Sequence, residues 1–263
     1  MIAVMADEDR IDFTMCNPPF YTSTEELLAC AKSKARPPQS ACTGAEVEMV
    51  TLGGEVAFVG QMIDESRHLG DRCQWYTSML GKASSVEKIV QKLKDVGIQN
   101  WAAKDLVQGN KTKRWCIAWT WADMRPNEKV SRASTTFSKA LLPFPTNFDF
   151  IAGDDLDVAA QRLNRTMQDL SLRWQYKPSI GMGLALTGAN VWSRAARRRK
   201  EQGQEEMDVG HEKDVALGVT ITISTAQSSG ANVRVRWLKG QDHVLFESFC
   251  GMLKRQLSTS NEA

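Results

Sequence analysis

Four consecutive residues, Asn17-Pro18-Pro19-Phe20, combine groups that can act chemically on a planar ring. They follow residues 11–16, where apolar and polar side chains alternate as in a strand. The Asn17 side chain and a proline backbone each offer a carbonyl oxygen as a hydrogen-bond acceptor. The two prolines end the strand and stiffen the turn. In doubly wound α/β folds, ligands bind at the carboxyl ends of strands, which is where Asn17 falls.

Acceptor oxygens of this kind suit a reaction at the exocyclic amine of adenine. That amine is a poor nucleophile because its lone pair is delocalised into the ring, so it needs acceptors rather than a strong base. Acceptors held in place favour the pyramidal, charge-bearing amine of the transition state, and the Phe20 ring can stack on the base. The turn therefore predicts methylation of an adenine amino group. A rigid turn without chemistry is the alternative for these four residues taken alone.

Composition and cysteine usage narrow the class of protein. The 263 residues are 42% apolar and 24% charged with a net charge of +2, which suits a globular protein of one large domain or two ordinary ones. No run is long and apolar enough to cross a membrane. The cysteines form no CxxC pair and the nearest histidines are not at ligand spacing, so we expect no metal site and a reducing compartment. They are Cys16, Cys30, Cys42, Cys73, Cys116 and Cys250.

Residues 1–122 alternate between strand-like and helix-like segments. Ser23 with Glu26, and Ser84 with Glu87, have the spacing of capping boxes that open helices. Strands are expected at 11–16, 73–80, 98–107 and 114–122; helices at 23–34, 55–69 and 84–97; and a long loop at 35–54. The two last strands form a hairpin, which matches the second half of a class I, Rossmann-like methyltransferase sheet. We therefore predict an α/β fold for this part.

The first half of such a sheet has no counterpart in the sequence. No Gly-rich turn follows a strand before residue 11, and no acidic residue ends a second strand to hold a ribose. These two features normally bind the methyl donor. The expectation is a domain that lacks its amino-terminal half.

The remaining sequence predicts a linker and a second, smaller domain. Residues 123–145 are polar and contain three prolines, as linkers do. Residues 146–263 predict an α+β accessory domain with a small antiparallel sheet. Its expected strands lie at 147–152, 172–176, 184–192, 215–225 and 233–238, its helices near 156–170 and 244–253, and a charged, flexible segment at 194–214.

Four stretches, taken together, carry a resemblance to a known family. They are DFTMCNPPFY (12–21), ARPPQSACTGAEVEMVTLGGEVAFV (35–59), WYTSMLGK (75–82) and KTKRWCIAWTW (111–121). In this order they resemble the RNA adenine N6-methyltransferases, a family that includes the eukaryotic U6 small nuclear RNA enzyme and a bacterial enzyme acting on large-subunit ribosomal RNA. The accessory domain is similar in its element order to a kinase-associated RNA-binding region of the eukaryotic enzymes.

The resemblance assigns roles to particular residues. It implies that Asn17, Pro18, Pro19 and Phe20 form the catalytic turn and that Asn17 also lies close to the methyl donor, S-adenosylmethionine. It implies contacts to structured RNA from four basic residues, Arg36, Lys82, Lys111 and Arg114.

A basic cluster in the accessory domain adds three candidates for phosphate contacts, Arg197, Arg198 and Arg199. The cluster at 194–200 could neutralise RNA phosphates or act as a nuclear import signal. Its alternative is a solvated loop beside the acidic run at 201–208. We expect a nuclear protein, with the cytoplasm as the alternative.

The combined interpretation is an S-adenosylmethionine-dependent enzyme that methylates the amino group of adenosine in structured RNA, of the U6 or ribosomal kind. A non-catalytic RNA-binding protein is the alternative, because the Gly-rich donor motif is absent from the sequence. A DNA or protein-glutamine methyltransferase fits the turn but fits the long loop and KTKRW poorly. The sequence leaves the RNA, the target adenosine and the oligomeric state open.

Overall fold

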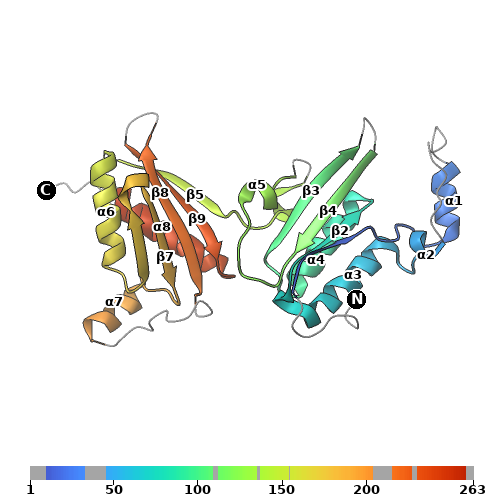
Figure 1. Ribbon diagram of the computed structural model, residues 1–263, viewed down its shortest axis with the longest axis horizontal. Helices are drawn as coiled ribbons and strands as arrows, with labels where there is room; N and C mark the ends of the chain where they lie inside the picture. The colour runs from blue at the N-terminus through green and yellow to red at the C-terminus, as the bar shows by residue number, and fades with distance from the viewer. Residues whose placement is uncertain are drawn as a thin grey trace. The chain divides into compact units, whose positions relative to one another are not determined.

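The computed structural model (Figure 1) describes residues 10–32, 46–108, 112–134, 137–153, 155–203, 215–226 and 230–258. The chain forms two compact units, one from residues 1–122 with 129–143 and the other from residues 123–128 with 144–263. Residues 129–143, in the segment expected to be a linker, thus belong to the first unit. None of the helices in the described ranges has the length and apolar character needed to span a bilayer.

The first unit is built on a four-stranded sheet in the order β1-β2-β4-β3. β1 and β2 are parallel, whereas β4 is antiparallel to both β2 and β3. This arrangement is that of the second half of a class I methyltransferase sheet and confirms the predicted α/β fold. The strands are β1 (Ile11–Cys16), β2 (Cys73–Leu80), β3 (Trp101–Gln108) and β4 (Thr112–Trp119); the helices are α1 (Thr24–Lys32), α2 (Glu46–Met49), α3 (Gly54–Leu69), α4 (Ala83–Asp95) and, where the chain passes between units, α5 (Glu128–Ser131).

Helices α3 and α4 pack together on one face of this sheet (Figure 1). Both carry apolar residues at helical spacing, and these residues are buried against the strands. They include Val59, Ile63, Val86, Ile89, Val90 and Leu93. Gly70 ends α3 and Gly97 follows α4, each at a positive φ of the kind that glycine tolerates.

Strand β1 leaves two of its apolar side chains exposed, whereas Ile11 packs against the core beneath α3 and α4. Thr14 lies opposite Tyr76 in the parallel register and is buried, whereas Phe13 and Met15 are 59% and 81% exposed. The alternation that predicted the strand is therefore real. Phe13 and Met15, however, are left uncovered by the described residues.

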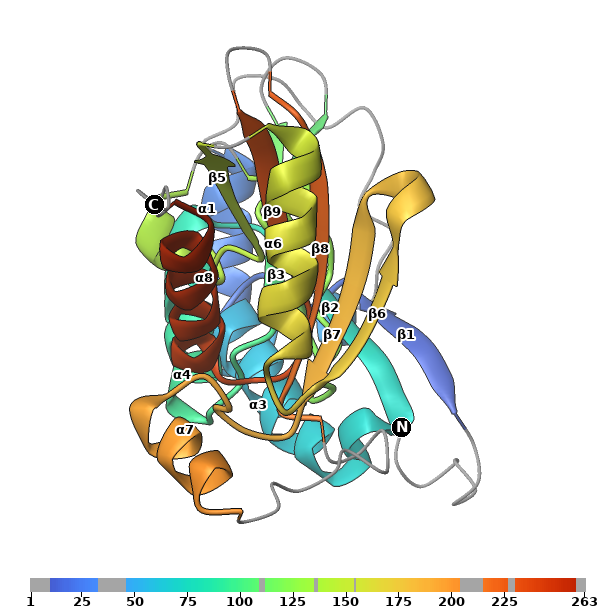
Figure 2. The ribbon, with the colours of Figure 1, turned by 90° about the vertical axis from the view of Figure 1, so that its left-hand side faces the viewer.

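The second unit is a five-stranded antiparallel sheet in the order β5-β9-β8-β7-β6. Helices α6 and α8 cover the same face of it (Figure 2), over a core that includes Leu163, Trp237 and Phe249. The strands are β5 (Asn147–Ala152), β6 (Arg173–Lys177), β7 (Met182–Thr187), β8 (Leu217–Thr225) and β9 (Ala231–Lys239); the helices are α6 (Leu156–Gln168), α7 (Arg194–Glu201) and α8 (His243–Ser258).

Helix α7 corrects one expectation, because residues 194–201 were predicted to be flexible. The Ser193 hydroxyl accepts a hydrogen bond from the Ala196 backbone N–H at 3.1 Å, which caps the helix, and the Ala196 side chain is buried. The prediction from sequence relied on the high charge of this segment and did not take into account the Ser193 cap or the apolar Ala196. Residues 204–214 of the same segment lie outside the described residues.

Candidate active site

The Asn17–Phe20 turn follows directly on β1, as the sequence predicted. Asn17 is exposed, Pro18 and Pro19 are buried, and Phe20 is half-buried. Beyond the turn, Tyr21 donates its backbone N–H to the Met49 carbonyl at 3.1 Å and accepts one from Thr51 at 3.0 Å. The turn is thus held by β1 on one side and by the end of α2 and the connection to α3 on the other, which leaves the exposed Asn17 on a fixed backbone.

Phe20 lies between a cation and a glycine. The Arg114 guanidinium of β4 sits 5.5 Å from the centre of the Phe20 ring, a cation–π arrangement. On the β2–α4 turn, a Cβ added at Gly81 would come within 3.0 Å of Phe20 Cδ1. Glycine therefore allows this turn to approach the ring. The structure brings two of the predicted site residues, Phe20 and Arg114, together.

Glu55, in the first turn of α3, fixes the position of the β2–α4 turn. Its buried carboxylate accepts hydrogen bonds from the backbone N–H groups of Gly81 at 2.6 Å and Lys82 at 3.1 Å. The prediction of a capping box at Ser84 and Glu87 is wrong: α4 begins at Ala83, and its N-cap residue is Lys82, whose side chain makes no hydrogen bond that caps the helix. Sequence analysis missed Glu55, since its partners lie 26 and 27 residues away and no local spacing reveals them.

We expect Glu55→Ala to lower the free energy of unfolding by about 2 kcal/mol, because two backbone donors lose their acceptor in a partly buried turn. Glu87→Ala, which removes an exposed carboxylate from α4, should cost less than about 0.5 kcal/mol. Urea unfolding followed by fluorescence measures both. Equal losses for the two variants would show that the Glu55 carboxylate does not hold the turn.

The next residue of that turn, Lys82, is paired with helix α1. Lys82 Nζ lies 2.8 Å from Glu26 Oε1, while Glu26 Oε2 accepts from the Thr22 backbone N–H at 2.8 Å and the Thr22 hydroxyl at 2.6 Å. The Ser23 hydroxyl accepts from the Glu26 N–H at 3.2 Å, so one half of the predicted capping box is present. The hydrogen bond from Lys82, followed by those from Thr22, lowers the pKa of Glu26 to about 2.

This pKa shift predicts an acid-sensitive link between α1 and the β2–α4 turn. A carboxyl group whose pKa falls from its ordinary 4.5 to about 2 on folding stabilises the fold above pH 4.5, and that stability is lost as the pH falls toward 2. The effect is small, because Lys82 is 55% and Glu26 26% exposed and water screens the pair. The urea midpoint of the unmodified protein should fall more steeply over this pH range than that of Glu26→Gln. Parallel curves would contradict the link.

The remaining predicted residues are five basic side chains. Arg36 and Lys111 lie outside the described residues. Arg197, Arg198 and Arg199 are exposed on α7 in the second unit. Within the described ranges, no group of three or more His, Cys, Asp or Glu side chains is placed to hold a metal ion.

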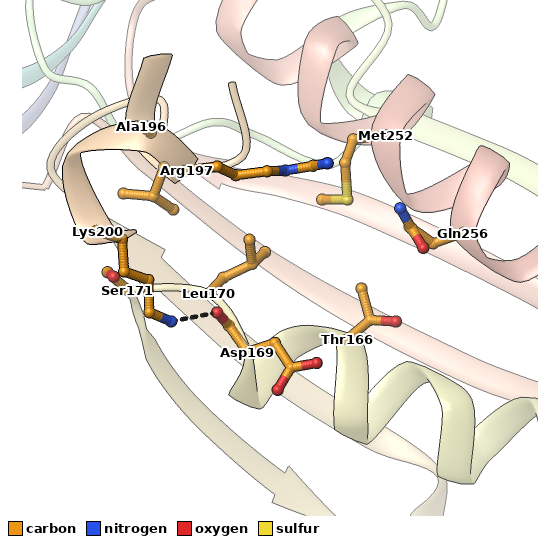
Figure 3. Close-up of a pocket in the computed structure, with 10 residues that line it drawn as sticks. Thr166, Asp169, Leu170, Ser171, Ala196, Arg197, Lys200, Met252 and Gln256 are labelled. Carbon is orange, nitrogen blue, oxygen red and sulfur yellow. Dashed lines mark hydrogen bonds between the residues drawn. The ribbon is translucent and has the colours of Figure 1, made fainter. Parts of the chain in front are cut away.

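Arg197 and Lys200 of α7 line a cavity of about 250 Å³ beside α6 and α8. Figure 3 shows Arg197 extending from α7 toward Met252, while Lys200 Nζ donates to the Asp169 carbonyl at 2.6 Å. One face of α7 is therefore fixed against its own unit.

The part of the chain that contains the turn is similar to known proteins. Residues 1–123 match the Methyltransf_10 family, described as RNA methyltransferase. The chain is 33% identical over 251 residues to the U6 small nuclear RNA (adenine-(43)-N(6))-methyltransferase of Schizosaccharomyces pombe, covering 95% of this chain and 61% of that protein. It is 25% identical to a Danio rerio RNA N(6)-adenosine-methyltransferase, covering 98% and 64% respectively.

A bacterial relative matches a shorter part. The ribosomal RNA large subunit methyltransferase F of a Marinomonas species is 34% identical over 127 residues, covering 44% of this chain and 38% of that protein. The chain spans about three fifths of the length of the two eukaryotic relatives.

Proposed function

Because residues 1–123 match a family described as RNA methyltransferase, we propose that the protein methylates the exocyclic amino group of an adenosine in structured RNA. The single observation that carries the proposal is the exposed Asn17 on a turn whose prolines are buried and whose Phe20 faces Arg114. Acceptors, an aromatic ring and a cation meet there at the carboxyl end of β1.

The residues of the turn divide the work between binding and chemistry. The Asn17 side-chain oxygen and the Pro18 carbonyl accept the two hydrogens of the adenine amine, which turns its lone pair out of the ring plane. Phe20 stacks on the base and orients it. Because the prolines restrict the backbone, little reorganisation is needed when charge develops on the amine.

S-adenosylmethionine supplies the electrophilic methyl group when it is bound. The exposed Asn17 amide can also donate hydrogen bonds. It is therefore compatible with S-adenosylmethionine bound at the carboxyl edge of β1. Among the described residues, we assign no other contact to S-adenosylmethionine. The proton that leaves the amine passes to water from the solvent-facing side of Asn17.

RNA phosphates are the proposed partners of the basic residues. We propose that Arg114, beside Phe20, and Lys82, whose Nζ is paired with Glu26, contact the RNA backbone that flanks an extruded adenosine. We further propose that Arg36 and Lys111 contribute from outside the described residues, and that Arg197, Arg198 and Arg199 of the second unit hold more distant phosphates. The RNAs named for the relatives are U6 small nuclear RNA and large-subunit ribosomal RNA. For this protein we favour a nuclear small RNA.

The test is methyl transfer by the full-length protein from labelled donor to an RNA hairpin with one unpaired adenosine. Calorimetry on the same preparation measures binding of the donor and of the hairpin separately. Labelled RNA supports the proposal. Tight RNA binding with no donor binding and no label would instead support a non-catalytic RNA-binding protein, the second candidate.

A further inference from the structure

The second unit contains a cavity of about 680 Å³ that the proposed reaction does not use. It lies between helix α6 and the hairpin formed by β6 and β7, which extends away from α6 in Figure 2. Its volume accommodates a flat ring of the size of a nucleobase with its sugar. The lining residues used below are Asp157, Gln161, Asn164, Tyr176 and Ser179.

One wall of the cavity contains Tyr176, whose ring stacks on that of Trp174. Trp174 and Tyr176 lie on the same face of β6, with ring centres 5.8 Å apart and planes inclined by 11°. The Trp174 indole N–H donates to Asn164 Oδ1 of α6 at 2.8 Å, and a Cβ on Gly183 would collide with the Trp174 ring. Glycine and the hydrogen bond therefore fix the ring plane, and Tyr176 presents an aromatic surface to the cavity.

The polar groups of the cavity suit the edge of a base. Because Asn164 Oδ1 is engaged by Trp174, the amide is oriented and its Nδ2 group can donate into the cavity. Gln161 can donate or accept, Ser179 can do both, and Asp157 accepts. Among the described lining residues, Asp157 is the one that carries a charge, and none is a lysine or arginine. This chemistry favours a neutral ring with amino or imino hydrogens over a phosphate.

A basic groove of about 370 Å³ adjoins the cavity along α6. Gln161 lines both, while Arg162 and Arg165 line the groove alone. Residues four apart on a helix have Cβ atoms roughly 5–6 Å apart, so Arg165 lies one turn from Gln161. The spacing matches the step from a base to a phosphate of the same nucleotide. The cavity has no cation among its described lining residues, whereas the groove has two arginines, so the two are complementary to the base and the phosphate of one nucleotide.

We infer that this cavity binds an unpaired base of single-stranded RNA, stacked on Tyr176, while the groove at Arg162 and Arg165 holds its phosphate. Stacking surfaces beside cationic grooves are the usual means of binding single strands. The inference rests on RNA as the partner proposed above, and not on methyl transfer.

The test compares affinities of the full-length protein for two probes, a labelled eight-nucleotide single-stranded RNA and a blunt RNA duplex of the same sequence. Tyr176→Ala should weaken single-strand binding about tenfold, the scale of one base–aromatic stack, and leave duplex binding unchanged. Tyr176→Phe keeps the ring and should bind as the unmodified protein does. Ile151→Ala, at an exposed position on the opposite edge strand β5, is the control for general surface changes.

The groove is tested with Arg165→Gln, which should weaken the binding of both probes. The slope of log Kd against log salt concentration should fall by the amount expected for about one phosphate contact. Single-strand affinity that is the same in Tyr176→Ala and Tyr176→Phe would overturn the inference and leave the cavity to another ligand, such as an apolar peptide. Because methyl transfer is not measured here, failure of this test is distinguishable from failure of the proposed reaction.

Discussion

Replacing Asn17 by alanine in the full-length protein is expected to lower kcat for methyl transfer about a hundredfold to a thousandfold, the usual cost of removing one fixed group that stabilises transition-state charge. The turn itself should survive, because Asn17 is exposed while Pro18 and Pro19 are buried and Tyr21 is anchored by its backbone. RNA affinity, measured by filter binding, should therefore change little. Single-turnover transfer of labelled methyl groups measures the loss.

The matched variant is Asn17→Asp, which keeps an acceptor oxygen at nearly the same place but loses the amide donor. It should retain more activity than Asn17→Ala. If the two variants were equally inactive with intact RNA binding, the acceptor role would be wrong and a donor role for the amide would replace it. Full activity in Asn17→Ala would remove the turn from the chemistry altogether.

The largest expected effect on stability is at Trp119, where alanine should lower the free energy of unfolding by about 4 kcal/mol. Trp119 is fully buried in β4, stacks on Tyr76 with ring centres 5.7 Å apart, and donates its indole N–H to Ser66 Oγ at 3.1 Å. Trp121 donates to the same hydroxyl at 2.9 Å. Deleting the ring therefore opens a cavity where β4, β2 and α3 meet.

Trp75→Ala provides the control, since this tryptophan is half-buried on β2 and lies opposite Phe13 on the face turned away from α3 and α4. It should cost less than half as much as Trp119→Ala. Chemical denaturation gives both values. A larger loss at Trp75 would indicate that the uncovered face of the sheet, rather than the core under α3, carries the stability of this unit.

Local patterns in the sequence predicted most of the first unit. The strand at 11–16, the helix ending at Gly70 and the strand at 73–80 were predicted within one residue of their bounds, because alternation, helical spacing and glycine stops act over a few residues. The position of Asn17 followed from the same patterns.

Contacts between distant segments could not be predicted in this way. Glu55 holds the backbone of Gly81, Gly81 admits Phe20, and Arg114 covers the ring, yet these four residues come from four separate segments. The Ser84–Glu87 spacing was present without forming a capping box, since Glu55 had already engaged the backbone just before α4. For α7, the charge of the arginines led to the prediction of a flexible segment, although Ser193 caps a helix there.

The most direct test of the central proposal identifies the methylated atom. RNA hairpins with one unpaired adenosine, or with purine riboside in its place, are incubated with the full-length protein and labelled S-adenosylmethionine, digested to nucleosides and resolved by mass spectrometry. We predict N6-methyladenosine from the first hairpin and no labelled nucleoside at that position from the second, which lacks the amine. Methyl groups on a ring nitrogen, or equal labelling of both hairpins, would contradict a site built to accept the hydrogens of an exocyclic amine.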